Sequence, residues 1–281
     1  MAQLVAIGLT AIAIQPIIAF APGSLIGAIA PVSLTMVAAA FVFGLSMQMI
    51  SGCGSGTLVN AGSGNVIALT ALPLFCVGSF LGTLLLPTAI EITPHIPVNF
   101  TESFGVGGSV VLTVAGLFAL GIIASRFSEG SLWNRKLLIA AAILAALAII
   151  HVLVAGQPWG VVYGLGLWVA KGAEGLGWDP TSAQFWIHPI NANALSKSIL
   201  TDTTSLTSLG LIGGAALAAW KDSSNQPFNQ SGATWYYLVA ALFGLLLGIS
   251  SRLAFGCNVG ALFSGIASGS LHGWAWLLAG F

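Results

Sequence analysis

Long apolar stretches recur along the whole chain, separated by short polar segments. A helix needs about 20 residues to cross about 30 Å of hydrocarbon, and most of these stretches approach that length. We expect spans at residues 4–20, 25–50, 66–90, 105–124, 137–154, 159–176, 199–220 and 235–255, and a run at 271–281 that is too short to cross. The alternating polarity of a membrane β-barrel is absent. The pattern therefore predicts an all-α polytopic membrane protein of about nine apolar segments.

Two polar segments, residues 53–65 and 257–270, lie between long apolar stretches and are rich in Gly, Ser and Asn. Irregular backbone at membrane depth is tolerated only where protein buries it or where it lines a watery cavity. Glycine-interrupted short segments at matching places in two halves of a chain indicate the binding site of a transporter. We therefore expect each segment to form a short half-helix that enters the membrane. The semi-polar stretch 178–197 is expected to hold another, and Asp202 to cap the span that follows it.

Composition supports a membrane location, because 57% of the 281 residues are hydrophobic and only 5% are charged, whereas a soluble domain averages about 25% charged residues. Seven Lys and Arg balance seven Asp and Glu, so no basic face for nucleic acid is expected. Three cysteines without a paired C-x2-C spacing suggest neither a disulfide framework nor a metal site, and no cofactor is implied. The apolar N-terminus lacks the features of a signal peptide and is expected to be a retained membrane segment.

One short motif occurs twice, with a cysteine at the same place in both copies. The first copy is Gly52-Cys53-Gly54-Ser55-Gly56-Thr57-Leu58, and 204 residues later the chain repeats it as Gly256-Cys257-Asn258-Val259-Gly260-Ala261-Leu262. A matching Gly-[Leu/Ile]-Ser precedes each copy, at residues 44–46 and 248–250. The repeat predicts an internal two-fold symmetry, with residues 1–124 and 155–281 as the two halves of one membrane domain. A basic loop and a helix at 125–154 join them.

Close helix packing is the alternative explanation of this motif, because G-C-x2-G is also the G-x3-G spacing of packed membrane helices. Gly78 and Gly82, Gly160 and Gly164, and Gly244 and Gly248 have that spacing without a cysteine. Packing explains glycines but does not require the polar residues Ser55, Thr57, Asn60, Asn258 and Ser264. We therefore favour a substrate pathway at Cys53 and Cys257, lined by Gly52, Gly54, Ser55, Gly56, Gly256, Asn258, Val259 and Gly260.

A half-helix that starts beside the cysteine would direct unpaired backbone N–H groups at the same point, which favours an anion. Neither motif contains Lys or Arg, so the anion would be held weakly enough to pass. A polarisable thiol suits a soft sulfur acceptor. Transport through S–H contacts requires neutral thiols, whereas covalent sulfur transfer requires a thiolate.

Four segments together resemble the YeeE/YedE family of bacterial sulfur-compound transporters: GCGSGTL at 52–58, FGCNVGALFSGIASGSLHGW at 255–274, PWGVVYGLGLWVAKGAEGLGWDP at 158–180 and SILTDTTSL at 198–206. The resemblance implies thiosulfate uptake through an hourglass-shaped protein of the bacterial inner membrane. Cysteines near its constriction would pass the ion along by S–H hydrogen bonds, with Cys53 at the centre and Cys257 in the second repeat. It also implies a cytoplasmic sulfur-carrier protein as a partner.

The chain departs from that family at its ends. Family members usually begin with a further helix and half-helix that carry an additional cysteine, and the last apolar run here is short. We expect a sequence trimmed at both ends, or a divergent short member. Cys76 lies in the middle of a predicted span and does not match the missing position, so it ranks below the two repeated cysteines as a pathway residue.

Three charged residues near span ends are also weaker candidates, namely Lys171, Arg252 and Asp202. Lys171 and Glu174 are three apart and are expected to neutralise each other on one helix face, although Lys171 would also suit the attraction of an anion to one mouth. Arg252 is expected to extend to the cytoplasmic interface, with the guidance of an anion at the exit as the alternative.

Orientation follows from the loop at 125–136, whose residues Arg126, Arg135 and Lys136 place it in the cytoplasm by the positive-inside rule. The loop between Glu91 and Glu102 then faces outside. Six apolar runs separate the two motifs, so the two copies are parallel if all six cross and inverted if one is re-entrant.

These patterns together predict a permease, not an enzyme, that imports thiosulfate or a related sulfur oxyanion. A membrane sulfurtransferase that carries a cysteine persulfide is one alternative. A channel or structural subunit for another small anion is the other.

Overall fold

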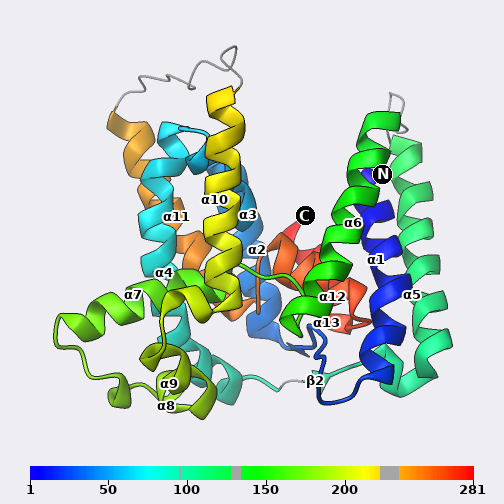
Figure 1. Cartoon of the computed structure of the whole chain (residues 1–281), viewed down its shortest axis with the longest axis horizontal. Helices are drawn as coiled ribbons and strands as arrows, with labels where there is room; N and C mark the ends of the chain where they lie inside the picture. The colour runs from blue at the N-terminus through cyan, green and yellow to red at the C-terminus, as the bar shows by residue number, and fades with distance from the viewer. Residues whose placement is uncertain (95, 128–133, 222–233) are drawn as a thin grey trace. The chain divides into compact units, whose positions relative to one another are not determined.

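The computed structural model describes residues 1–94, 96–127, 134–221 and 234–281 and is almost entirely helical (Figure 1). The α-helices are α1 (Ala2–Phe20), α2 (Leu34–Met49), α3 (Gly54–Gly62), α4 (Val66–Ile92), α5 (Phe100–Phe127), α6 (Arg135–Ala155), α7 (Val162–Gly175), α8 (Gln184–Ile187), α9 (Pro189–Ser196), α10 (Thr203–Lys221), α11 (Thr234–Leu253), α12 (Ser264–Ala267) and α13 (Leu271–Gly280). Short 3-10 turns η1 (Pro180–Ser182) and η2 (Ile199–Thr201) and a π-helix η3 (Asn258–Phe263) complete the helical elements. Two strands, β1 (Pro31–Val32) and β2 (Ile96–Pro97), pair antiparallel. The predicted all-α class is confirmed.

Six helical segments among the described residues are long and apolar enough to cross a membrane: Ala2–Phe20, Leu34–Gly62, Val66–Ile92, Phe100–Phe127, Arg135–Ala155 and Thr234–Ala267. The predicted spans at 4–20, 66–90, 105–124, 137–154 and 235–255 each correspond to one of them. The predicted spans at 159–176 and 199–220 are not among the six: the first is shortened to α7, which has 14 residues, and the second, α10, is rich in Thr, Ser and Gly. The predicted start of the second span at residue 25 is wrong. Residues 21–33 are irregular backbone and strand, and α2 begins only after Ser33, whose hydroxyl accepts the Met36 N–H at 3.1 Å and so caps the helix.

The chain forms two compact units that alternate along the sequence. Unit 1 comprises Met1–Val32, Ile96–Trp159 and Gly260–Ala275, and unit 2 comprises Ser33–His95, Gly160–Val259 and Trp276–Phe281. Neither unit coincides with a predicted repeat half, so the division at residues 124 and 155 remains a prediction about symmetry along the sequence.

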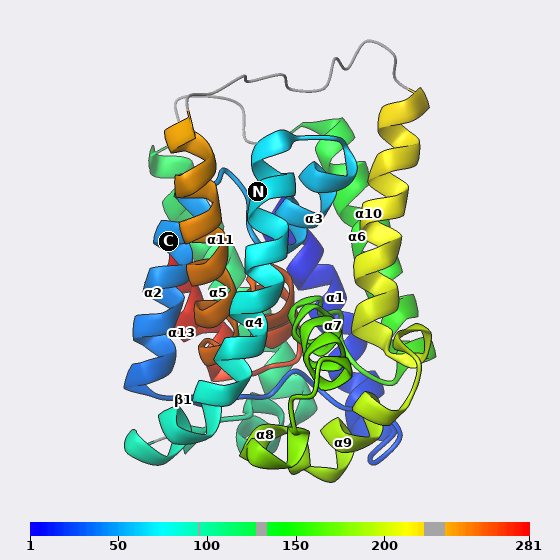
Figure 2. The same cartoon turned by 90° about the vertical axis from the view of Figure 1, so that its left-hand side faces the viewer.

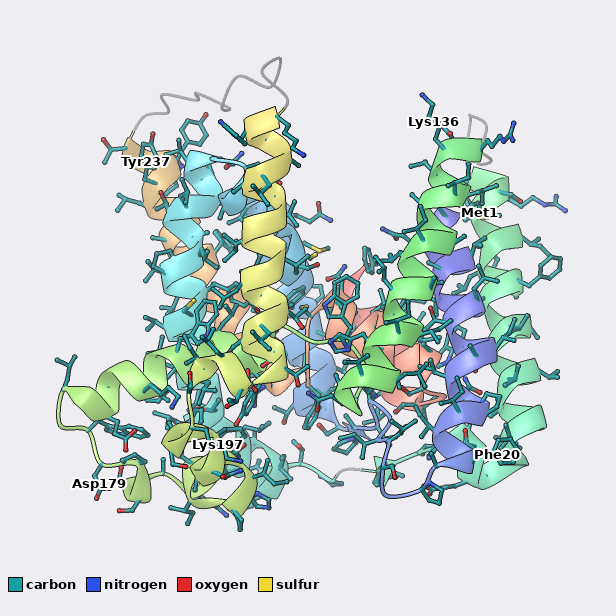
Figure 3. All side chains as sticks on the ribbon, viewed as in Figure 1. Met1, Phe20, Lys136, Asp179, Lys197 and Tyr237 are labelled. Carbon is teal, nitrogen blue, oxygen red and sulfur yellow. The ribbon has the colours of Figure 1, made fainter. Side chains whose placement is uncertain are left out.

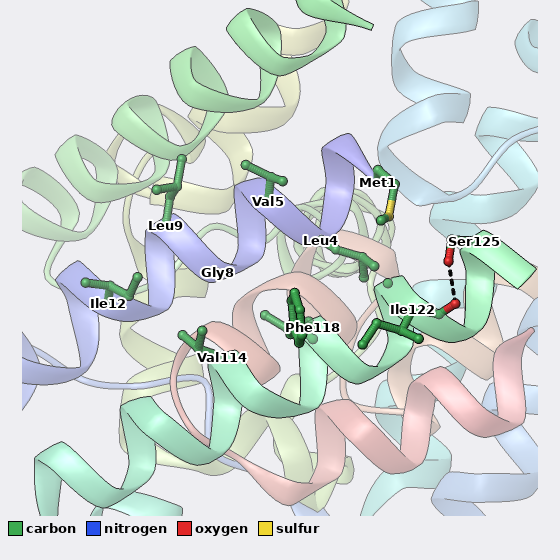
Figure 4. A pocket seen from close by; sticks show the side chains of 12 residues that line it. Met1, Leu4, Val5, Gly8, Leu9, Ile12, Val114, Phe118, Ile122 and Ser125 are labelled. Carbon is green, nitrogen blue, oxygen red and sulfur yellow. Dashed lines mark hydrogen bonds between the residues drawn. The ribbon is translucent and has the colours of Figure 1, made fainter. Parts of the chain in front are cut away.

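Unit 1 is built on α1, which packs against both α5 and α6. Its core contains Ile7, Ala11, Ile14, Leu117, Val152, Ile266 and Ala267. Met1 and Lys136, near the starts of α1 and α6, lie at one end of the unit, and Phe20 lies at the other (Figure 3). A groove of about 450 Å³ runs between α1 and α5 (Figure 4). Except for Ser125 its lining side chains are apolar, so the groove offers no charge for an anion.

Unit 2 is built on the close packing of α4 against α11, with α2 and α7 beside them (Figure 2). Small residues make this packing possible, because added methyl groups would overlap the neighbouring backbone. A Cβ at Gly78 would lie 2.1 Å from the Leu245 carbonyl oxygen, and one at Gly248 would lie 2.4 Å from that of Phe75. Gly244 lies against Ala71 and Gly82 against Arg252 in the same way. The packing function considered for these two G-x3-G pairs is confirmed.

Candidate functional site

The two copies of the cysteine motif begin with the same backbone turn. In the first copy Ser51 has φ 53°, and in the second Phe255 has φ 58°. They are the only non-glycine residues with positive φ in the described parts of the chain. The N–H groups of Gly52 and Gly256 return to the carbonyls of Met47 and Ser251 at 3.1 and 2.7 Å, which is the hydrogen-bond pattern of a Schellman motif. The two copies are thus alike in backbone conformation as well as in sequence. Non-glycine residues in the left-handed conformation concentrate at functional sites.

Cys53 follows the first turn and caps a short helix. Its sulfur accepts the Gly56 N–H at 3.3 Å and lies 3.4 Å from the Ser55 hydroxyl. Its carbonyl oxygen accepts the Thr57 hydroxyl and the Thr57 N–H, both at 2.8 Å. The half-helix predicted after Cys53 is confirmed as α3, which has nine residues. The Gly56 amide, however, is bound to the thiol and does not point freely at an anion.

Cys257 follows the second turn and is completely buried. The helix after it differs from α3, because residues Asn258–Phe263 form a π-helix that continues into α12. The same backbone turn ends each of the two short helical segments: Asn65 N–H binds Asn60 O after α3, and Ser270 N–H binds Gly265 O after α12. These two turns are 205 residues apart, whereas the two cysteines are 204 residues apart. One residue has therefore been added after Cys257. A π-helix accommodates such an insertion and often occurs at functional sites.

Tertiary packing within unit 2 brings the two motifs together. A Cβ built on Gly54 would lie 2.9 Å from Cys257 Cβ, 3.0 Å from Cys257 Sγ and 3.3 Å from the ring of Phe75. The residue next to Cys53 is thus in direct contact with the second cysteine, although 203 positions separate them in the sequence. Only glycine leaves room for this approach.

The motif glycines differ from the packing glycines of α4 and α11. A Cβ at Gly52 would meet Thr57 at 3.2 Å and the Asn60 side chain at 3.6 Å, both in α3, and a Cβ at Gly56 would meet only the Cys53 sulfur, at 3.4 Å. Neither residue therefore supports the close packing of two long helices. Asn258, next to Cys257, has a buried side-chain oxygen without a hydrogen-bond partner among the described residues. Such a group in a protein interior is a candidate for a ligand contact.

The two copies run in opposite directions. Contacts of Ala71 with Gly244 and of Phe75 with Gly248 show that α4 and α11 are parallel. The start of α2 lies beside the end of α4, where the hydroxyls of Thr35 and Thr93 are 3.0 Å apart, and α2 runs opposite to α4 (Figure 2). Because α2 precedes Cys53 and α11 precedes Cys257, the equivalent helices of the two copies run in opposite directions. Of the two arrangements considered from the sequence, the copies are therefore inverted.

The weaker candidates are placed elsewhere. Cys76 lies on α4 and is half-buried, outside both motifs. The expected pairing of Lys171 with Glu174 is wrong: the Lys171 ammonium donates to the backbone carbonyls of Leu195 and Lys197. These carbonyls lie at the C-terminal end of α9, where a cation is favourable. Lys171 therefore stabilises the end of this helix, and its donors are engaged by carbonyls and not by an anion.

Asp202 forms the predicted cap. Its carboxylate accepts the Ser205 N–H at 2.6 Å and the Thr204 hydroxyl at 2.7 Å at the start of α10. We expect Asp202→Ala to lower the free energy of unfolding by about 1 kcal/mol and Asp202→Asn to lower it less, with anion uptake unchanged in both. Thermal melting in detergent and an uptake assay measure the two effects. Lost uptake in an Asp202→Asn protein of normal stability would place this carboxylate in the pathway instead.

A family model described as Sulphur transport matches residues 1–281. The chain belongs to the Sulphur transport family. The resemblance inferred from the motifs is thereby confirmed, and the family and the relatives found are transporters, not enzymes. Together with the six apolar helices, membership identifies a multi-pass membrane protein.

Three curated relatives match this member of the family. The probable transporters YedE of Escherichia coli and Salmonella typhimurium are 35% and 36% identical over 86 residues, which is 30% of this chain and 21% of each relative. The thiosulfate transporter TsuA of Spirochaeta thermophila is 25% identical over 261 residues, covering 83% of this chain and 70% of that protein. The match to the YedE proteins thus spans about one fifth of their length.

The sequence patterns did not identify two parts of this site. The contact between Gly54 and Cys257 depends on how α3 packs in unit 2, and the repeat only suggested that the thiols share a pathway. The π-helix was missed because the seven-residue motif aligns without a gap, and the extra residue shows only in the backbone that follows it.

Proposed function

We propose that this protein imports thiosulfate or a related sulfur oxyanion across the bacterial inner membrane. The anion passes Cys53 and Cys257, which guide it by S–H and backbone N–H hydrogen bonds. Family membership and the name of the relative from Spirochaeta thermophila support the substrate class. The observation that carries the mechanism is the contact of Gly54 with Cys257, because it brings two repeated, distant thiol segments to one place.

The hydrogen bonds at Cys53 suit a donor thiol. Because the sulfur already accepts the Gly56 N–H, its own proton remains available for the Ser55 hydroxyl or for a passing anion. A thiol is a weak donor and a polarisable partner, which matches the terminal sulfur of thiosulfate better than an oxygen. Weak and repeated contacts allow an ion to leave as well as to enter.

The neighbourhood of Cys53 favours transport over sulfur transfer. A persulfide mechanism needs a reactive thiolate, which a base, a cation or a helix N-terminus promotes. Cys53 lies at the start of α3, where its sulfur contacts a backbone amide and a serine hydroxyl, but among the described residues no base or cation is bound to it. We further propose a cytoplasmic sulfur-carrier protein as the acceptor of the imported sulfur.

Uptake of radiolabelled thiosulfate into proteoliposomes tests this function. We expect wild-type protein to transport, and Cys53→Ala and Cys257→Ala to lose at least about tenfold in rate, about 1.4 kcal/mol in the barrier. Cys53→Ser keeps a hydrogen-bond donor but replaces the soft sulfur, so its uptake rate should lie between those of wild type and Cys53→Ala. Cys76→Ala is the matched control, because it removes a half-buried thiol from outside both motifs, and its rate should equal that of wild type.

Two results would contradict the proposal. Normal uptake by folded Cys53→Ala protein would remove the thiol pathway. A persulfide found on Cys53 by mass spectrometry during turnover would replace passive guidance by covalent sulfur transfer.

A further inference from the structure

The guanidinium of Arg252 lies against two neighbouring aromatic rings in unit 2. Its Cζ is 5.2 Å from the centroid of Phe185 in α8 and 5.6 Å from that of Tyr163 in α7. Both distances are within the range of about 6 Å for a cation–π interaction. The stem of the side chain crosses α4 at Gly82, where an added Cβ would lie 2.7 Å from Arg252 Cβ. The sequence predicted that this side chain extends to the cytoplasmic interface, whereas in the structure its guanidinium packs against the two rings.

The aromatic walls are held in place by hydrogen bonds. Asn191 accepts the Tyr163 hydroxyl at 2.9 Å and donates to the backbone carbonyl of Phe185 at 2.8 Å, so one side chain ties the Tyr163 ring to the backbone of α8. Trp186 is fully buried, packs edge-to-face against Phe185 with ring centroids 5.1 Å apart, and donates to the Thr83 hydroxyl of α4 at 3.0 Å. The guanidinium thus packs against a preorganised aromatic surface, a contact that its planar shape favours.

No protein group neutralises this charge in the described part of the chain. Arg252 has no hydrogen bond and no ion pair there, and its buried Nε lacks a partner. The Asp202 carboxylate is engaged by Thr204 and Ser205 at the start of α10. An ionisable residue in a membrane span normally pairs or serves a function. Among the described residues, the donors of Arg252 are therefore open to an anion from outside the chain.

Arg252 and the two cysteine motifs contact α4 at different levels. On α4, Phe75 contacts Gly54 next to Cys257, and Gly82 contacts Arg252; seven helical residues correspond to about 10 Å. Along α4, Gly82 is nearer than Phe75 to the end that precedes the loop between Glu91 and Glu102, which the sequence predicts to face outside. By the positive-inside rule, Arg252 is then on the outer side of the thiols, at the entrance.

We propose that Arg252, held by Tyr163 and Phe185, is the outer docking site for a divalent sulfur oxyanion before it reaches the cysteines. This inference rests on the proposed function and divides recognition into two steps. The guanidinium recognises charge and oxygen atoms by charge-assisted hydrogen bonds, and the neutral thiols then recognise sulfur. Sulfate, which has the charge and the oxygens, should compete at the first step.

Transport kinetics in proteoliposomes separate this function from a structural one. We expect Arg252→Gln to raise the KM for thiosulfate at least about tenfold and to change the maximal rate less than about threefold, because docking is lost and the thiols remain. The inhibition constant of sulfate should rise in the same proportion. Arg252→Lys keeps the charge but not the fork of donors and should show a smaller rise. Lys171→Gln removes a positive charge that is bound to carbonyls and should leave KM unchanged.

A second measurement, the rise in melting temperature that thiosulfate or sulfate causes in detergent, distinguishes failure of this inference from failure of the proposed function. Stabilisation of wild type that Arg252→Gln abolishes supports the docking site even if no uptake is seen. Three results overturn it: a KM within twofold of wild type in folded Arg252→Gln protein, stabilisation by anion that persists in that variant, or no stabilisation of any variant.

Discussion

Gly54→Ala is expected to reduce thiosulfate uptake at least about tenfold, about 1.4 kcal/mol in the transport barrier, in a protein that still folds. The added methyl would lie 2.9 Å from Cys257 Cβ and 3.0 Å from its sulfur, closer than atoms in contact approach. Cβ is fixed to the backbone, so rotation of the Cys257 side chain cannot relieve the overlap. The two segments must separate, and the two thiols lose their common position. Uptake into proteoliposomes measures the effect, with melting temperature as the check of the fold.

Gly172→Ala is the matched control, since Gly172 also lies in a helix of unit 2 but has open space where its Cβ would be. A double-mutant cycle on the melting temperature adds a sharper test. In a Cys257→Gly background, where Cβ and Sγ are gone, Gly54→Ala should no longer lower the melting temperature. Wild-type uptake in Gly54→Ala, or an equal loss of stability in both backgrounds, would show that this contact does not organise the site.

Gly248→Val is expected to prevent the fold of unit 2. Its Cβ alone would lie 2.4 Å from the Phe75 carbonyl oxygen and 2.5 Å from the Ser79 nitrogen, and backbone atoms in the middle of α4 have no alternative position. Overpacking of a tight core typically destabilises by about 1–3 kcal/mol, and a backbone clash between two central helices should reach at least the upper end. Size-exclusion chromatography and melting in detergent should show little or no folded protein.

The same substitution at Gly213 provides the comparison. Gly213 lies on an exposed face of α10 and has nothing near its Cβ position, so Gly213→Val should yield folded protein with a melting temperature near that of wild type. If Gly248→Val melted like wild type as well, the parallel packing of α4 against α11 would be contradicted.

The sequence predicted most of the helices because apolar length alone decides which segments can cross hydrocarbon. It failed where a span was extended back to residue 25, since residues 21–33 are nearly as apolar as the helix that follows them. Pro31 and the capping hydroxyl of Ser33 mark the end of the irregular segment. A hydropathy pattern does not detect such single-residue signals, because it averages over a window of many residues. Lys171 was misassigned for another reason: its true partners, the carbonyls of Leu195 and Lys197, are distant in sequence.

The sequence by itself determined the membrane class, the two repeated cysteines and the family, because each depends on residue type and on spacing along the chain. Tertiary structure alone decided that Gly54 meets Cys257 and that the repeats are inverted. It also decided that Arg252 packs against two aromatic rings, with no counter-charge among the described residues. These features arise where helices far apart in sequence pack within van der Waals distance, and such contacts depend on the direction and depth of each helix, which composition and periodicity do not encode.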